Sequence, residues 1–80
     1  MKEIIVKSFW DEEARVWVAE SEDVPGLATE AETVELLIEK LKIMIPELLS
    51  ANKKGLYDKD DSIPFQVVSE RTEYAYFQIQ

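Results

Sequence analysis

Residues 16–33 read VWVAESEDVPGLATEAET and decide the fold, because they hold a strand, a turn, a second strand and the start of a helix in succession. Apolar side chains alternate over residues 15–20, which is typical of a strand. Residues 27–30 predict another short strand after the turn. Thr33 is the expected N-cap of a helix, since its hydroxyl can accept a hydrogen bond from a backbone N–H of the first turn.

The turn between these two strands is predicted from its residue types. Proline fixes φ near about −65° and glycine tolerates positive φ, so Pro25 and Gly26 suit the two central positions of a type II turn. Asp23 stands two residues before this pair. We assign Asp23, Pro25 and Gly26 as the structural turn, and Thr33 as the cap that follows it.

Beyond this stretch the chain predicts two more strands and one helix. Residues 1–10 have the strand pattern, and residues 11–14 form a connection of hairpin length. Residues 53–55 predict the end of the helix, and residues 63–79 predict an unusually long final strand. Within the helix, the apolar residues that repeat at three- and four-residue steps are Leu37, Leu41, Met44, Ile45 and Leu48.

The predicted order of elements is therefore β-β-β-α-β, within a single domain of residues 1–80. We expect an α+β fold, namely a two-layer sandwich with a mostly antiparallel sheet and one helix on one of its faces.

Composition excludes several classes of function. The 80 residues have a net charge of −8, and a charge of that sign repels a phosphate backbone, so we expect no direct contact with nucleic acid. Cysteine and histidine are both absent, which removes disulfides, thiolate zinc sites, cysteine nucleophiles and imidazole bases. A domain this small often needs a further stabiliser, and a partner subunit is the expected one.

The chain predicts neither a membrane span nor a secretory leader. No window approaches 18 uninterrupted apolar residues, and the residues after Met1 lack the apolar stretch of a signal peptide. We expect a cytoplasmic protein.

Carboxylates are the only plentiful reactive groups, and they do not form a known site. Residues 58–61 invite a calcium-loop interpretation, but the positions that need Gly and Glu hold Ile63 and Ser69. We therefore expect no enzyme, no catalytic residue, no cofactor and no bound metal. The alternative is a metal-dependent hydrolase of ribonuclease H-like ancestry, which would use Asp11 with Asp23 or Asp61.

Both faces of the predicted sheet have large apolar side chains, although one helix can cover only one face. Ile4, Val6, Val16 and Val18 are expected on one face, and Ile5, Phe9, Trp17 and Val68 on the other. Aromatic rings left in water would form an aggregation-prone patch. Either these rings pack over a sheet edge or under a loop, or a partner covers the second face. We favour the partner.

The final strand is too long for a compact domain of this size. At about 3.3 Å per residue, residues 63–79 would span roughly 56 Å, against a radius of gyration of about 12 Å. Residues 69–73 could fold the second half back, or that half could leave the domain and lie on a partner. We predict the second solution, a homodimer whose contact includes residues 72–79. The candidate interface comprises Ile5, Phe9, Trp17, Val68, Tyr74, Tyr76, Phe77 and Ile79.

Residues 9–14 (FWDEEA), 16–19 (VWVA) and 21–33 (SEDVPGLATEAET) together resemble the HicB-like antitoxin superfamily. The small stand-alone branch of that superfamily, which is of unknown function, also has a segment similar to IPELL at residues 45–49. The resemblance extends from residue 2 to about residue 70. It implies a degraded ribonuclease H-like fold without its catalytic acids, and a dimer.

The resemblance also implies an antitoxin-like protein that neutralises a small basic RNA-cleaving toxin. Full HicB proteins have a C-terminal DNA-binding segment, whereas residues 74–80 here read YAYFQIQ, so operator binding is not expected. The remaining alternative is a dimeric scaffold without a toxin partner.

Overall fold

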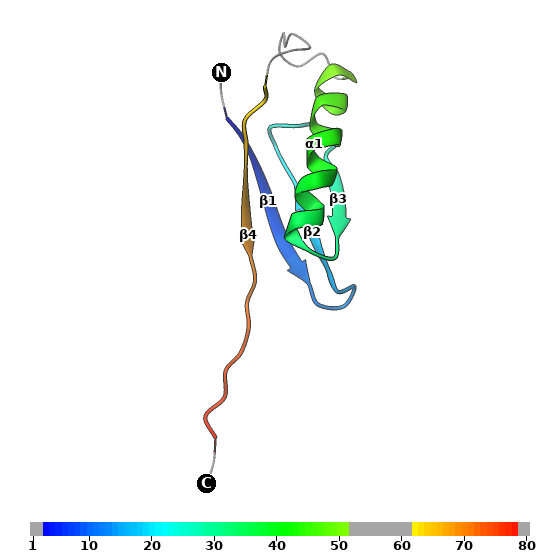
Figure 1. The fold of residues 1–80 in the computed structure, drawn as a ribbon. Coiled ribbons are helices and arrows are strands. Elements are labelled where there is room, and N and C mark those ends of the chain that lie inside the picture. Colours follow the sequence, from blue (N-terminus) through cyan, green and yellow to red (C-terminus); the bar gives the residue numbers. More distant parts are fainter. Residues whose placement is uncertain (1–2, 52–61, 79–80) are drawn as a thin grey trace.

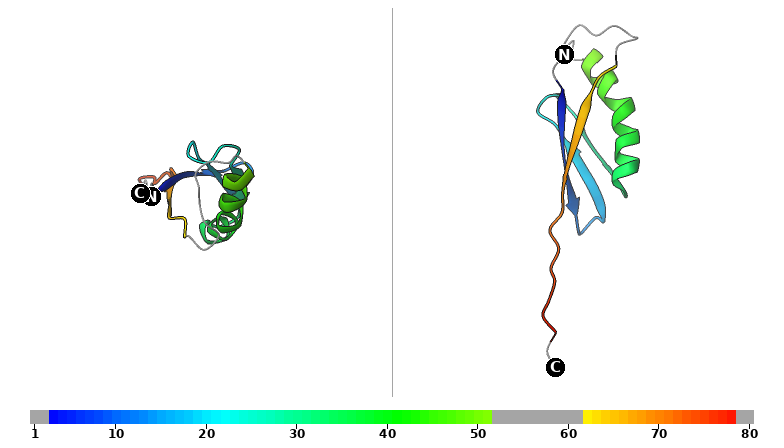
Figure 2. Two further views of the ribbon diagram at one scale, coloured as in Figure 1. Left: turned by 90° about the horizontal axis from the view of Figure 1, so that it is seen from above. Right: turned by 60° about the vertical axis from the view of Figure 1, so that its left-hand side comes forward.

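The computed structural model describes residues 3–51 and 62–78 and shows a two-layer α+β sandwich (Figures 1 and 2). One mixed sheet has the strand order β3-β2-β1-β4, in which β1 is antiparallel to β2 and parallel to β4. A single helix covers one face of the sheet. This confirms the predicted fold class. The elements are β1 (Ile4–Asp11), β2 (Val16–Glu20), β3 (Ala28–Ala31), α1 (Val34–Ala51) and β4 (Phe65–Glu70).

The hydrophobic core lies between α1 and the sheet. Burying each large aliphatic side chain contributes about 1.5–3 kcal/mol to stability. Trp17, Met44 and Leu48 pack at the margin of this core. Its buried members are Leu37, Leu41, Ile45 and Leu49 from the helix, Ile4, Val6, Ala19 and Ala31 from the strands, and Val24 and Leu27 from the connection between β2 and β3.

The predicted helix cap is confirmed. The backbone N–H of Leu36 donates a hydrogen bond of 3.1 Å to Oγ1 of Thr33, directly before the helix begins at Val34. Glu35 adds a negative charge in the first turn, where the helix dipole favours it. The stop expected at residues 53–55 lies outside the described residues.

The predicted turn is confirmed as well. The N–H of Leu27 donates to the carbonyl oxygen of Val24 over 3.1 Å, which places Pro25 and Gly26 at the two central positions. Gly26 has a φ of +86°, which a residue with a side chain rarely adopts. A Cβ there would also lie 3.7 Å from the side chain of Leu48 on α1.

Side chains from the same connection continue the pairing of β1 beyond the end of β2. The last β1–β2 pair is Lys7 with Glu20, so no strand residue faces the backbone of Ile5 on that side. Oδ2 of Asp23 accepts from the N–H of Ile5 at 2.9 Å, and Oγ of Ser21 donates to its carbonyl oxygen at 2.6 Å. The N–H of Asp23 in turn donates to Oγ of Ser21 at 3.1 Å. These bonds satisfy the backbone groups that β2 does not reach.

The expected assignment of β2 to the two faces is wrong. Trp10 pairs with Trp17, so Trp17 lies on the helix-covered face and contacts the core. Val16 and Val18 pair with Asp11 and Phe9 and therefore lie on the opposite face. The register implied by the prediction differs from this one by a single residue, which is enough to move every side chain of β2 to the other face. We call this second face the open face. Its apolar residues are Ile5, Phe9, Val16, Val18 and Val68.

The predicted long final strand is also wrong. β4 ends at Glu70, where its pairing with Phe9 of β1 ends, and residues 71–78 continue away from the domain as an extended segment (Figure 1). We call residues 71–78 the tail. It accounts for the elongated shape, with extents of 63 × 23 × 19 Å and a radius of gyration of 15.8 Å. The second half therefore leaves its own domain, as one of the two solutions predicted.

Replacing Ser8 or Ser21 by alanine should change the stability of the protein in opposite directions. Oγ of Ser8 is buried under α1 without a hydrogen-bond partner, whereas Oγ of Ser21 makes two bonds. Ser8→Ala should raise the free energy of unfolding by about 1 kcal/mol, and Ser21→Ala should lower it by about 1–2 kcal/mol. Urea unfolding followed by circular dichroism measures both. Both variants remove one serine hydroxyl. A loss of stability in both would contradict the absence of a hydrogen-bond partner for Oγ of Ser8.

Candidate partner-binding surface

The tail exposes three aromatic rings to solvent. Tyr74, Tyr76 and Phe77 are 76%, 83% and 101% exposed. No backbone hydrogen bond joins residues 71–78 to another residue within the described ranges. Exposed apolar rings on unpaired extended backbone are typical of a segment that binds another strand.

The start of the tail is fixed to the sheet through Arg71. Cζ of Arg71 lies 4.2 Å from the centroid of the Trp10 ring, a cation–π contact. Nε of Arg71 also donates to Oε2 of Glu73 at 2.5 Å. Arg71 therefore stays on the helix-covered side of the sheet, next to Trp10, and Glu73 points to the same side.

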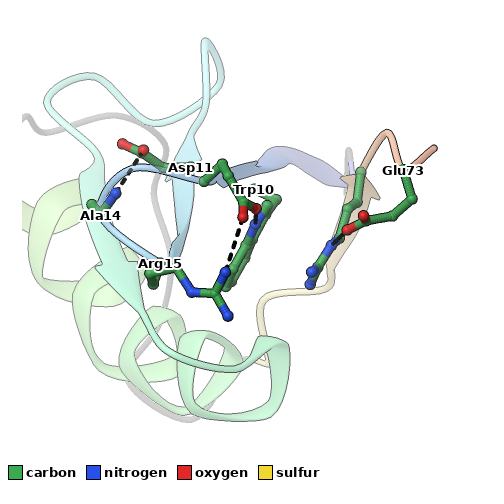
Figure 3. A network of polar contacts seen from close by, with 7 residues as sticks. Trp10, Asp11, Ala14, Arg15 and Glu73 are labelled. Carbon is green, nitrogen blue, oxygen red and sulfur yellow. Dashed lines mark hydrogen bonds and ion pairs between the residues drawn. The ribbon is translucent and has the colours of Figure 1, made fainter.

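Trp10 is the centre of a cluster at this end of the sheet (Figure 3). Its ring packs edge-on against Trp17, with centroids 5.6 Å apart and an interplanar angle of 62°. Its Nε1 donates to Oε2 of Glu12 at 2.5 Å. Cζ of Arg15 lies 5.7 Å from the same ring, and a guanidinium N–H of Arg15 donates to Oε1 of Glu12 at 2.9 Å. The hairpin and the start of the tail thus meet on one indole ring.

This cluster lowers the pKa of Glu12 below its ordinary value of 4.5. The largest cause is the hydrogen bond from Trp10, which favours the ionised carboxylate. The charge of Arg15 and its hydrogen bond, and the more distant charge of Arg71, act in the same direction, while desolvation opposes them.

The structure brings together part of the predicted interface. Ile5, Phe9 and Val68 share the open face, and Phe9 and Val68 are 42% and 39% exposed. Trp17 does not belong to this set, because it faces α1. The three rings of the tail lie beyond the end of β4, and Ile79 lies outside the described residues.

A second apolar surface escaped the sequence analysis. Leu36 and Ile43 lie seven residues apart on α1, off the buried stripe, and are 54% and 64% exposed. They line a groove between α1 and the edge of the sheet at β3, which we call the α1–β3 groove. The seven-residue spacing of Leu36 and Ile43, which places them on one side of a helix, was the sequence signal that could have revealed this surface. The lining residues are Val16, Glu30, Ala31, Glu32, Leu36, Glu39, Lys40 and Ile43.

The acids considered for a hydrolase have structural roles and lie far apart. Oδ1 of Asp11 accepts from the N–H of Ala14 at 3.0 Å within the hairpin, and Asp23 holds the backbone of Ile5. Ile5 and Asp11 are six positions apart on β1, which corresponds to about 20 Å. Asp61 and the loop at residues 58–61 lie outside the described residues.

The described residues provide neither a cluster of metal ligands nor a membrane-spanning helix. Residues 3–51 and 62–78 contain no group of three or more acidic side chains that could hold a metal ion. No helix in this part of the chain is long and apolar enough to cross a membrane.

The family is decided by comparison with known proteins. The model of a family described as a domain of unknown function, DUF1902, matches residues 3–79. The chain belongs to the DUF1902 family. A solved structure is similar to this DUF1902 chain: the crystal structure of a hypothetical protein from the extremely thermophilic bacterium Thermus thermophilus. The two are 47% identical with a TM-score of 0.70, over 95% of this chain and 100% of the other. No match was found among curated proteins.

The cluster around Trp10 predicts a specific titration. Trp10→Phe keeps an aromatic ring but removes the indole N–H, so the pKa of Glu12 should rise toward 4.5. In the native protein, the stabilisation that Glu12 provides is present above its unfolded pKa and is lost as the pH falls through its lowered folded pKa. A carboxyl-detected NMR titration from acidic to neutral pH measures the shift. An unchanged pKa in the variant would show that the indole bond is not its main cause.

Proposed function

We propose that this DUF1902 protein is a non-catalytic, HicB-like interaction protein. It forms a homodimer through residues 72–79 and binds a small basic partner protein, as an antitoxin does. The observation on which this rests is the tail, which presents three exposed aromatic rings on unpaired backbone. A chain that folded and acted alone would gain nothing from holding these rings in water.

The positions of the acids support a binding role rather than hydrolysis. A two-metal site needs carboxylates that converge on ions about 4 Å apart. Asp11 and Asp23 are instead occupied by backbone N–H groups near opposite ends of β1. The element order β-β-β-α-β is that of the ribonuclease H core, so this arrangement agrees with a fold that has lost its catalytic acids.

Charge supports a basic partner. The net charge of −8 on 80 residues steers positively charged proteins toward the surface and raises their association rate. The α1–β3 groove combines apolar contact area, from Leu36 and Ile43, with Glu32 and Glu39, while Lys40 is bound to the backbone carbonyl of Glu30 at its edge. We assign this groove to the basic partner and the tail to the homodimer. The resemblance to HicB-like antitoxins gives the class of partner, a small basic toxin.

Removing the tail tests the homodimer. A chain that ends after Glu70 loses the proposed contact but keeps all five described elements, so it should stay folded and sediment as a monomer. Analytical ultracentrifugation measures its mass, and circular dichroism checks its fold. A second, full-length variant with both Tyr76→Ser and Phe77→Ser keeps the backbone of the tail and removes only two of its rings. It should also weaken the dimer. A truncated chain that stays folded and dimeric would place the dimer contact elsewhere.

The groove predicts how a basic partner binds. The product of a short basic reading frame next to this gene should copurify with the protein, with an on-rate that falls steeply from low to physiological salt. Ile43→Asp should weaken that binding by about ten-fold or more, since it places a carboxylate in the apolar contact. Ala28→Asp is the matched control, because it adds the same charge at an exposed position of β3 on the open face, outside both the groove and the tail. Equal losses in both variants would exclude the groove. An on-rate independent of salt would exclude electrostatic steering of the partner. A dimer that binds no basic protein would favour the scaffold.

A further inference from the structure

We propose that two copies pair their β4 strands and tails as one antiparallel ribbon, with the two-fold axis passing between the two Thr72 residues. This inference rests on the proposed homodimer and adds its register. Each tail then lies along the outer edge of the other copy's β4, and the two sheets become continuous.

The outer edge of β4 has backbone groups free to pair. The N–H of Ile4 donates to the carbonyl oxygen of Pro64, while Ile4 is aligned with Phe65. In a parallel pair of strands, the even-numbered residues of β4 therefore point their backbone groups toward β1, and the odd-numbered ones point theirs outward. Because β4 is the last strand in the sheet order, no strand of the described chain takes those outward groups.

The alternation of side chains continues into the tail. Val67 lies on the helix-covered face and Val68 on the open face. Arg71 remains on the helix-covered face, because it lies 4.2 Å from the Trp10 ring, and Glu73 bonds to it on the same side. Continued alternation places Tyr74 and Tyr76 with the open face, and Ala75 and Phe77 with the helix-covered face.

Symmetry limits the possible registers. A two-fold axis perpendicular to a continuous sheet leaves each face on its own side, so residues that oppose each other must share a face. Opposed residue numbers are then both odd or both even, and one residue must oppose its own copy. The candidates for that central residue are the positions around the start of the tail, 70 to 74.

Thr72 is the central residue that gives the most favourable pairs and opposes no like charges. Opposite charges, aromatic–β-branched pairs and threonine pairs each stabilise antiparallel strands. With Thr72 opposite itself, Arg71 opposes Glu73, Val68 opposes Tyr76 and Val67 opposes Phe77. The remaining pairs are Glu70 with Tyr74, Ser69 with Ala75 and Gln66 with Gln78.

The other registers place like charges together or leave valines unpaired. Centring on Arg71 opposes two guanidinium groups, and centring on Glu70 or Glu73 opposes two carboxylates, which destabilises antiparallel strands. Centring on Tyr74 moves the aromatic rings away from the valines of β4. The register centred on Thr72 also covers Val68, which is 39% exposed, with the ring of Tyr76.

Disulfide trapping tests the register directly, because the chain has no cysteine of its own. Even-numbered residues form the non-hydrogen-bonded pairs on the outer edge, so two Thr72 Cα atoms would lie about 4.5 Å apart, within the range for a disulfide. Thr72→Cys should form about ten-fold more covalent dimer under mild oxidation than Arg71→Cys or Glu73→Cys, whose own copies lie about 7–8 Å away on the diagonal.

An exchange of charges gives a second, independent test. Arg71→Glu and Glu73→Arg each place like charges opposite one another across the ribbon, so each variant alone should dimerise about ten-fold more weakly. Mixing the two variants restores opposite charges between the copies but not within either chain. The mixture should therefore form heterodimers with close to the native affinity, measured by ultracentrifugation with one variant labelled.

The outcomes separate this register from the homodimer itself. A native dimer that is not trapped by Thr72→Cys, or that is trapped better at position 71 or 73, overturns the register and leaves the homodimer standing. A mixture of the charge variants that stays as weak as its components also overturns it. A native chain that sediments as a monomer overturns both the register and the proposed homodimer.

Discussion

The parallel pairing of β1 with β4 is the constraint on which the other elements depend. β3 and β4 lie at opposite edges of the sheet, so the chain has to cross from one edge to the other between them. It does so as α1, over one face, because parallel strands need a long crossover connection. The same crossing buries Leu37, Leu41 and Ile45 against the sheet, and none of the described elements covers the other face. It also makes β4 an edge strand whose continuation is the tail.

Local chemistry made much of this fold predictable from the sequence. Pro25, Gly26 and Thr33 each have a backbone requirement that depends only on near neighbours, and the structure confirms all three positions. The side of the sheet that Trp17 occupies depends instead on its pairing with Trp10, which follows from the conformation of the hairpin. Arg15 adopts a φ of 59° there, and nothing in the sequence marks this residue for a left-handed conformation. The sequence pattern alone could not resolve that register.

The candidate surface was predictable to a different degree in its two parts. The rings of the tail stand out because a polar stretch separates them from the apolar part of β4, and one straight strand through both would be too long for the domain. Leu36 and Ile43 were harder to recognise, because a helix of this composition has apolar residues on more than one side. Only the packing of α1 on the sheet distinguishes the buried stripe from these two exposed residues. The contact between Arg71 and Trp10 was missed for a similar reason, since it joins residues distant in sequence.

Charge explains why such a dimer would use an extended tail rather than its open face. Each copy has a net charge of −8, so two copies repel one another when their surfaces come close. At physiological salt this repulsion decays over about 8 Å. Stacking the open faces would bring two acidic bodies within that distance over a broad area. The proposed pairing through residues 66–78 would instead place the two bodies diagonally along a shared ribbon, with Arg71 of each copy near the centre. In such a dimer the extended form of the tail would separate the acidic surfaces, and the groove on each body would stay accessible to the proposed basic partner.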